Sequence, residues 1–202
     1  MNAATRALVR LSAAIRAGDR ARLDAAIDQA AAVCDDRAAE EAIVQSYLFL
    51  GYPAALNAMT LWRSRTGRMP AAHSGDDPAH WAARGADVFR IVYGEQDRRL
   101  LENVSALHPE LAEWMLTEGY GKVLGRPGLG LPERELCIVA MLVGLDAAPQ
   151  LRSHLRGALN AGAAADDVAA ALDAGCEGIA PERAADGVRI WHDVRMRHER
   201  TN

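Results

Sequence analysis

Residues 131–160 read LPERELCIVAMLVGLDAAPQLRSHLRGALN, a pattern that predicts two amphipathic helices joined by a short turn. Pro132 and Pro149 each stand where a helix would have its first turn, so we expect helices over 132–145 and 149–161. Each helix carries one apolar stripe at helical spacing, formed by Leu136, Val139, Ala140 and Val143 in the first and by Leu151, Leu155, Ala158 and Leu159 in the second. The two helices are therefore predicted to pack against each other.

Two ionisable side chains on these helices, Glu135 and His154, are the first candidates for chemistry. Glu135 precedes the turn near Asp146 by about ten residues and His154 follows it by about seven, so a rise of about 1.5 Å per residue places them within roughly 5 to 8 Å in height. They could face each other across the hairpin. Spacing alone leaves the structural alternative open, because a lone histidine on an apolar face is usually a hydrogen-bonded core residue and a first-turn glutamate is favoured by the helix dipole.

The composition extends the helical prediction to the whole chain of 202 residues. Roughly a fifth of the residues are alanine, the strongest helix former, while aromatic residues make up only 5%. We therefore expect an all-α fold. Further helices are predicted over 4–17, 19–34, 36–65 with a break at Gly51-Tyr52-Pro53, 79–92, 95–106, 109–124, 165–175 and 181–199.

The stretch GRMPAAHSGDDP near residues 67–78 has the composition of a surface connection and suggests two units. We expect a partial helical unit over 1–66, a linker over 67–78 and a complete domain over 79–202.

Charge and cysteine content exclude several classes of function. The 27 acidic and 23 basic residues give a net charge of −4, which argues against nucleic acid and membrane surfaces as partners. No apolar run approaches the length of a membrane-spanning helix. The three cysteines, Cys34, Cys137 and Cys176, form no CxxC pair or Cys/His cluster, so neither a disulfide framework nor a metal site is expected. A reducing cytoplasm is the predicted location.

The region from about Gly85 to Leu172 resembles the carboxymuconolactone decarboxylase family, which belongs with the alkylhydroperoxidase D-like proteins. The resemblance rests on Gly121 with the turn Arg126-Pro127-Gly128-Leu129, on Arg134-Glu135-Leu136 at a helix start, and on His154 followed by Ala158-Leu159 and Gly162. It implies an alkylhydroperoxidase D-like helical bundle, and a homo-oligomer with a trimer as the first expectation and a dimer as the second.

The segment YLFLGYPAALNAM, residues 47–59, looks like the part that normally closes this family's domain, so the chain resembles one and a half copies. The first unit lacks a histidine where His154 would fall, and the second unit has largely lost the closing pattern. This complementarity suggests one composite pocket, with Tyr47, Tyr52 and Asn57 from the first unit beside Glu135 and His154. Two decayed repeats are the alternative.

The resemblance implies chemistry without metal or organic cofactor. The family's peroxidase branch keeps the Glu-to-His spacing seen here but places two cysteines where this chain has Ala147 and Gln150, so a thiol peroxidase has no route. The decarboxylase branch needs a site that binds a small acidic substrate, releases CO2 and protonates the carbanion left behind. A histidine held by a glutamate suits that proton transfer, and arginines are natural carboxylate ligands, with Arg126 and Arg134 the candidates here.

The leading hypothesis is a carboxymuconolactone decarboxylase-like enzyme that acts on a small carboxylated lactone or related acid, with Glu135 and His154 as catalytic residues. A non-catalytic oligomeric ligand-binding or scaffold protein of the same fold is the alternative. An alkylhydroperoxidase-type thiol peroxidase is the least favoured of the three, because the CxxC pair is absent.

Overall fold

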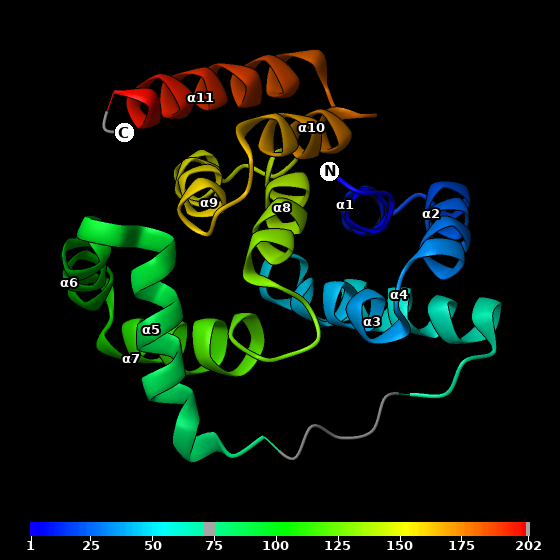
Figure 1. Ribbon diagram of the computed structural model, residues 1–202, viewed down its shortest axis with the longest axis horizontal. Helices are drawn as coiled ribbons and strands as arrows, with labels where there is room; N and C mark the ends of the chain where they lie inside the picture. Colours follow the sequence, from blue (N-terminus) through cyan, green and yellow to red (C-terminus); the bar gives the residue numbers. More distant parts are fainter. Residues whose placement is uncertain (71–75, 201–202) are drawn as a thin grey trace. The chain divides into compact units, whose positions relative to one another are not determined.

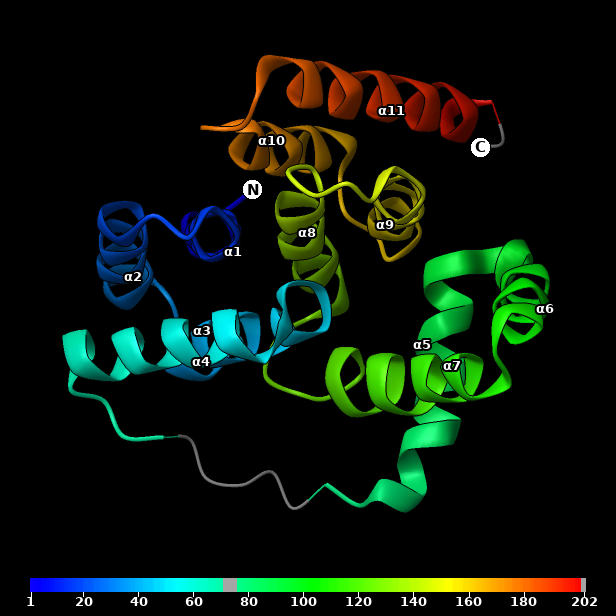
Figure 2. The ribbon, with the colours of Figure 1, turned by 180° about the vertical axis from the view of Figure 1, so that it is seen from behind.

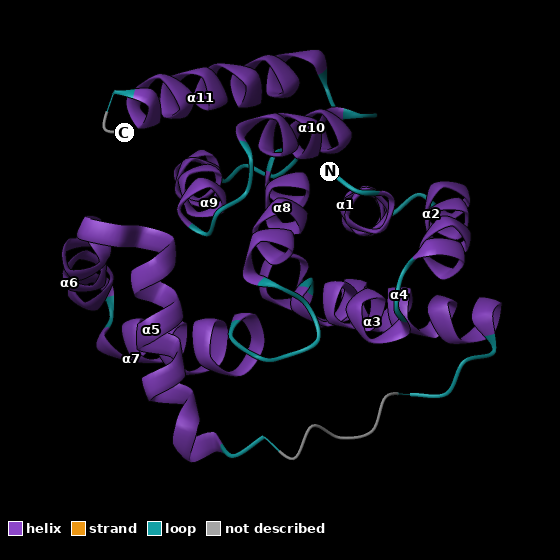
Figure 3. Ribbon diagram, in the orientation of Figure 1, coloured by secondary structure: helices purple, strands orange, loops and turns teal. Residues whose placement is uncertain are grey.

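The computed structural model describes residues 1–70 and 76–200, and every regular element in this part of the chain is helical (Figures 1 and 3). The predicted all-α class, consistent with an alkylhydroperoxidase D-like bundle, is confirmed. Contacts divide the chain into unit 1, Met1–Ala71 with Gly128–Asn202, and unit 2, Ala72–Pro127.

The helices of unit 1 come from both ends of the chain: α1 (Ala3–Ala17), α2 (Arg20–Val33), α3 (Asp36–Gln45), α4 (Tyr47–Thr66), α8 (Leu131–Leu142), α9 (Ala148–Asn160), α10 (Ala165–Cys176) and α11 (Pro181–Glu199). The sequence predicts two separate units over 1–66 and 79–202. The contacts instead join the N-terminal helices to α8 and α10, because the buried face of α1 packs on both (Figure 2). Whether the halves are copies of one domain stays a prediction.

Helix α8 lies at the centre of unit 1. Its residues from Arg134 to Leu142 are all buried, and it contacts α1, α9 and α10. The predicted stripes on α8 and α9 are buried, and the two helices pack together as expected. Helix α11 covers α9 and α10 on the other side of the unit, as both ribbon views show (Figures 1 and 2). The core therefore surrounds the pair of helices that carries Glu135 and His154.

Local sequence signals fix the helix ends. Gly18 ends α1 in the left-handed conformation at φ 67°, and the Asp19 side chain accepts a hydrogen bond from the backbone N–H of Arg22 at the start of α2. The predicted corner at Gly51 is confirmed, because this residue has φ 79° and ψ 165° between two helical stretches of α4. An additional break at Ser46, which separates α3 from α4, was not predicted.

Unit 2 contains α5 (Trp81–Tyr93), α6 (Asp97–Leu107), α7 (Pro109–Trp114), the short helices η1 (Pro78–His80) and η2 (Gly94–Gln96), and the π-helical segment η3 (Met115–Leu124). The sequence predicted one helix over 109–124, but the chain changes from α to π geometry after Trp114. Two glycines allow α5 and η3 to approach closely. A Cβ atom on Gly85 would lie 1.9 Å from the carbonyl oxygen of Leu116, and one on Gly121 would lie 2.1 Å from the carbonyl oxygen of Trp81.

We expect Gly121→Ala to lower the free energy of unfolding by about 1 to 3 kcal/mol, because backbone atoms of α5 must move to admit the methyl group. Gly119→Ala is the matched control in the same segment, because a Cβ atom there meets nothing within 4 Å. Chemical denaturation of both variants measures the difference. Equal stability of the two variants would contradict the close approach.

Candidate active site

Glu135 and His154 meet in the core of unit 1. The Nδ1 atom of His154, on α9, lies 2.8 Å from Oε2 of Glu135, on α8. Glu135 is fully buried and His154 is 5% exposed. The structure confirms that the two side chains face each other, as the spacing indicated. A carboxylate at this position accepts a hydrogen bond from Nδ1–H, which fixes the imidazole's tautomer and leaves Nε2 for other partners.

The second oxygen of Glu135, Oε1, is buried and has no hydrogen-bond partner among the described residues. Buried polar atoms are nearly always paired, and a carboxylate oxygen left without a donor in the core is costly. Such an atom in a helix-to-helix interface makes the pair a candidate functional site.

Phe49 packs against the histidine and was not identified from the sequence. Its ring meets the His154 imidazole edge-on, with ring centres 5.5 Å apart and planes at 86°. The bend at Gly51 separates the turn that carries Phe49 from the rest of α4. The apolar cluster YLFL before Gly51-Tyr52-Pro53 indicates that Phe49 packs in the interior. It does not indicate that Phe49 packs against His154, because an apolar pattern does not identify the contacting residue.

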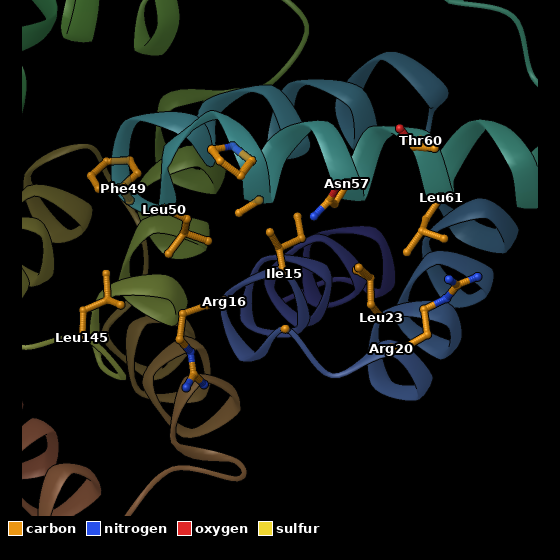
Figure 4. A pocket seen from close by; sticks show the side chains of 13 residues that line it. Ile15, Arg16, Arg20, Leu23, Phe49, Leu50, Asn57, Thr60, Leu61 and Leu145 are labelled. Atoms are coloured by element: carbon orange, nitrogen blue, oxygen red, sulfur yellow. The ribbon is translucent and has the colours of Figure 1, made fainter.

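Phe49 also lines a groove of about 800 Å³ between α4 and the α1–α2 hairpin (Figure 4). The predicted site residue Asn57 lines the same groove, and its amide points toward Ile15 of α1 (Figure 4). The first third of the chain therefore contributes to a groove that adjoins His154 through Phe49. Of the five residues in the predicted composite pocket, Asn57 alone is among those that line this groove, and the composite pocket stays a prediction.

The two predicted tyrosines stack on each other across the Gly51 corner. The ring centres of Tyr47 and Tyr52 are 4.8 Å apart with planes at 19°. Tyr52 is 60% exposed, whereas Tyr47 is half-buried. Neither is among the residues that line the groove beside Phe49, so their predicted part in substrate binding remains without support from the geometry.

Arg134 was predicted to bind substrate, but the structure places its guanidinium in an internal network. It is fully buried, its Nη2 lies 2.8 Å from Oε2 of Glu41, and its Nη1 lies 3.3 Å from the side-chain oxygen of Gln45. Its Nε donates to the backbone oxygen of Leu129. A guanidinium whose donors are engaged in this way links α3 to α8. These contacts do not favour the predicted role of Arg134 in substrate binding, which stays a prediction. The sequence showed Glu41 and Gln45 only as polar residues of a helix.

Arg126 lies in unit 2, after η3. Its charge reinforces the hydrogen bonds from Arg84 that hold the pKa of Asp76 at about 2, together with a hydrogen bond from the indole of Trp81. The predicted role of Arg126 as a carboxylate ligand stays a prediction.

The three cysteines are poor nucleophiles in the folded protein. Burial raises the pKa of the Cys137 thiol to about 12 and that of Cys34 to about 11, and it also raises the pKa of Cys176. Since the thiolate is the reactive form, these shifts oppose thiol chemistry. Cys137 is fully buried and packs as a small hydrophobic residue.

We expect Cys137 to resist iodoacetamide in the native protein near pH 8, where a pKa of about 12 leaves only about 10⁻⁴ of the thiol as thiolate. Unfolding in guanidinium chloride should expose all three cysteines to rapid alkylation. Peptide mass spectrometry of the two samples measures the difference. Fast native labelling at Cys137 would show that its surroundings open in solution.

Within residues 1–70 and 76–200, no group of three or more His, Cys, Asp or Glu side chains is arranged to hold a metal ion. In the same part of the chain, none of the helices combines the length and the apolar character needed to cross a membrane.

Comparisons with known proteins agree with the resemblance. Residues 109–192 match the profile of the Carboxymuconolactone decarboxylase family. The chain is 35% identical over 144 residues to Peroxisomal protein 2 of Schizosaccharomyces pombe, covering 68% of this chain and 66% of that protein. It is 33% identical over 86 residues to 4-carboxymuconolactone decarboxylase of Acinetobacter baylyi, covering 42% of this chain and 64% of that enzyme. A protein of Saccharomyces cerevisiae, also named Peroxisomal protein 2, is 34% identical over 84 residues, which cover 41% of this chain and 30% of that protein. The matches thus span slightly less than two thirds of the first relative and smaller shares of the others.

Proposed function

We propose that the chain is a decarboxylase-like carbon–carbon lyase, because its residues 109–192 match the Carboxymuconolactone decarboxylase family. Its substrate is a small carboxylated lactone or a related acid, and His154 transfers the proton. The buried contact of 2.8 Å between His154 and Glu135 is the observation that carries this proposal.

The proposed step uses the free nitrogen of the imidazole. The bond between the substrate carbon and its carboxylate breaks, CO2 leaves, and the electron pair stays on the carbon. The Nε2–H of a protonated His154 then gives its proton to that carbon, and the neutral imidazole recovers a proton from solvent. Glu135 stabilises the imidazolium and keeps Nε2 oriented, since its Oε2 lies against Nδ1.

A turnover screen tests the proposal. Purified protein is offered small carboxylated lactones, β-keto acids and unsaturated dicarboxylic acids, and CO2 release is followed, with His154→Ala run in parallel and a hydroperoxide assay beside it. We expect CO2 from at least one acid, dependent on His154, and no hydroperoxide reduction. No turnover across the set, or turnover that the variant retains, would contradict the proposal.

A non-catalytic ligand-binding or scaffold protein is the second candidate. It is favoured by the match over 144 residues to a relative whose name states a location and no reaction. Calorimetric binding of an acid that is never turned over would support it. That name also makes the peroxisome a second candidate location beside the cytoplasm.

We further propose a homo-oligomer, with a trimer as the first expectation and a dimer as the second, as the family resemblance implies. Light scattering on the eluting protein measures the subunit number.

A further inference from the structure

The groove between α4 and the α1–α2 hairpin is larger than a small lactone requires. Its volume of about 800 Å³ falls in the range of pockets that enclose drug-sized ligands. Apolar side chains line most of its length, including Ile15, Leu23, Leu50 and Leu61 (Figure 4). Such a surface favours a ligand with an extended apolar body.

Arg16 contributes a positively charged guanidinium to the groove. Its Nη2 donates to the backbone oxygen of Gly175, at 2.8 Å, while its Nε is buried without a hydrogen-bond partner. The guanidinium lies against Gly144, where a Cβ atom would come 2.3 Å from Nη1. Contacts with α10 and with Gly144 therefore hold the group in place, while part of its hydrogen-bonding capacity is unused.

Among residues 1–70 and 76–200, no carboxylate forms an ion pair with Arg16, although the nearby arginines of α2 are paired. Arg20, which also lines the groove, is bound by Asp24 at 3.1 Å, and Arg22 lies 3.6 Å from Glu177. Burial and the nearby charge of Arg22 lower the pKa of Arg16, which shows that the surroundings disfavour its charge. A half-buried cation without a counter-ion is a natural position for an anionic ligand group.

We propose that the groove binds a carboxylate with an extended apolar body, an acyl- or aryl-chain acid, whose carboxylate lies at Arg16 and whose body follows α4. Binding of this acid in the groove does not depend on the proposed function. The further step, that the acid is also the substrate, rests on the proposed function. Arg16, Phe49 and Leu145 lie at the same end of the groove (Figure 4), and Phe49 touches His154 edge-on. The carboxylate of the bound ligand would therefore lie at the end of the groove nearest His154, the residue proposed to transfer the proton.

Calorimetric titration with 4-phenylbutanoate and its uncharged amide tests the site without requiring turnover. We expect the wild-type protein to bind the carboxylate about tenfold more tightly than the amide, the size of effect that one charge-assisted contact gives. Arg16→Gln should abolish this preference. Arg20→Gln is the matched control at the other end of the groove and should keep it.

Two further variants separate this site from the catalytic proposal and from a folding defect. His154→Asn should bind the carboxylate as the wild type does, because the imidazole is not the anion's ligand here. Gly144→Ala keeps the charge of Arg16 but displaces its head group, and should weaken carboxylate binding if Arg16→Gln is too unstable to measure.

Equal binding of acid and amide by the wild type would overturn the assignment, as would a preference that survives both the Arg16 and the Gly144 change. Either result leaves the His154 chemistry standing. Carboxylate binding that depends on Arg16, without CO2 release from any acid, would instead support the groove and contradict the proposed reaction.

Discussion

Replacing His154 by asparagine is expected to lower kcat by about 10²- to 10⁴-fold, the range that general acid–base groups contribute. Asparagine keeps a polar group beside Glu135 and so limits the cost of leaving that carboxylate buried without its partner. After CO2 leaves, the substrate carbon must receive a proton. Asparagine cannot donate it. Steady-state kinetics with the best acid from the screen measure the effect.

Two further variants distinguish chemistry from packing. Glu135→Gln should also lower kcat, because the amide carries no charge to stabilise the imidazolium and no longer holds Nδ1–H as a carboxylate does. His192→Ala is the matched control, since this histidine is exposed on α11, and its kcat should equal that of the wild type. An unchanged kcat in His154→Asn would show that the buried pair is structural.

Replacing Glu41 by alanine is expected to lower the free energy of unfolding by about 3 to 5 kcal/mol. The change removes the carboxylate that lies 2.8 Å from the guanidinium of Arg134, while Arg134 remains fully buried. Removing one partner of a buried ion pair takes away a counter-charge from the charge that stays in the core, and this cost exceeds the net contribution of the pair itself. Chemical denaturation measures the loss.

A double variant separates the lost pair from the buried charge. Glu41→Leu combined with Arg134→Met removes both charges and should recover much of the stability, because apolar groups of similar volume can replace a buried pair. The surface change Arg189→Ala is the control, since its partner Asp186 is exposed and the effect should stay within about 1 kcal/mol. A double variant as unstable as Glu41→Ala would show that shape, and not charge, holds α3 to α8.

The helices and the central pair could be predicted because their signals are local. Proline in first turns, Asp19 and Gly18 fix helix ends within a few residues of where they occur, and the spacing of Glu135 and His154 depends only on helical rise. Both therefore follow from short stretches of sequence. The π geometry of Met115–Leu124 was not predicted from such signals. This segment packs closely on α5 where Gly85 and Gly121 leave room, a contact between separate helices that local sequence does not reveal.

The remaining parts of the site depend on contacts between distant residues. Arg134 looked like a carboxylate ligand because Glu41 and Gln45, about ninety positions earlier in the chain, gave no sign that they would reach it. Phe49 and Arg16 were missed for the same reason. Their partners, His154 and the backbone of Gly175, are brought to them only when the N-terminal helices pack on α8 and α10.

Unit 1 is built from the two ends of the chain, and this affects how the protein is made on the ribosome. Helix α1 packs on α2 directly, but also on α8 and α10, which are synthesised more than a hundred residues later, so the part of its surface that contacts these two helices lacks its partners for on the order of ten seconds at ordinary translation rates. During that interval the part of α1 that the finished fold buries against α8 and α10 is open to solvent and to chaperones. Completion of this core is therefore a late, post-synthetic event, and a nascent chain stopped before α8 is expected to be an aggregation-prone species.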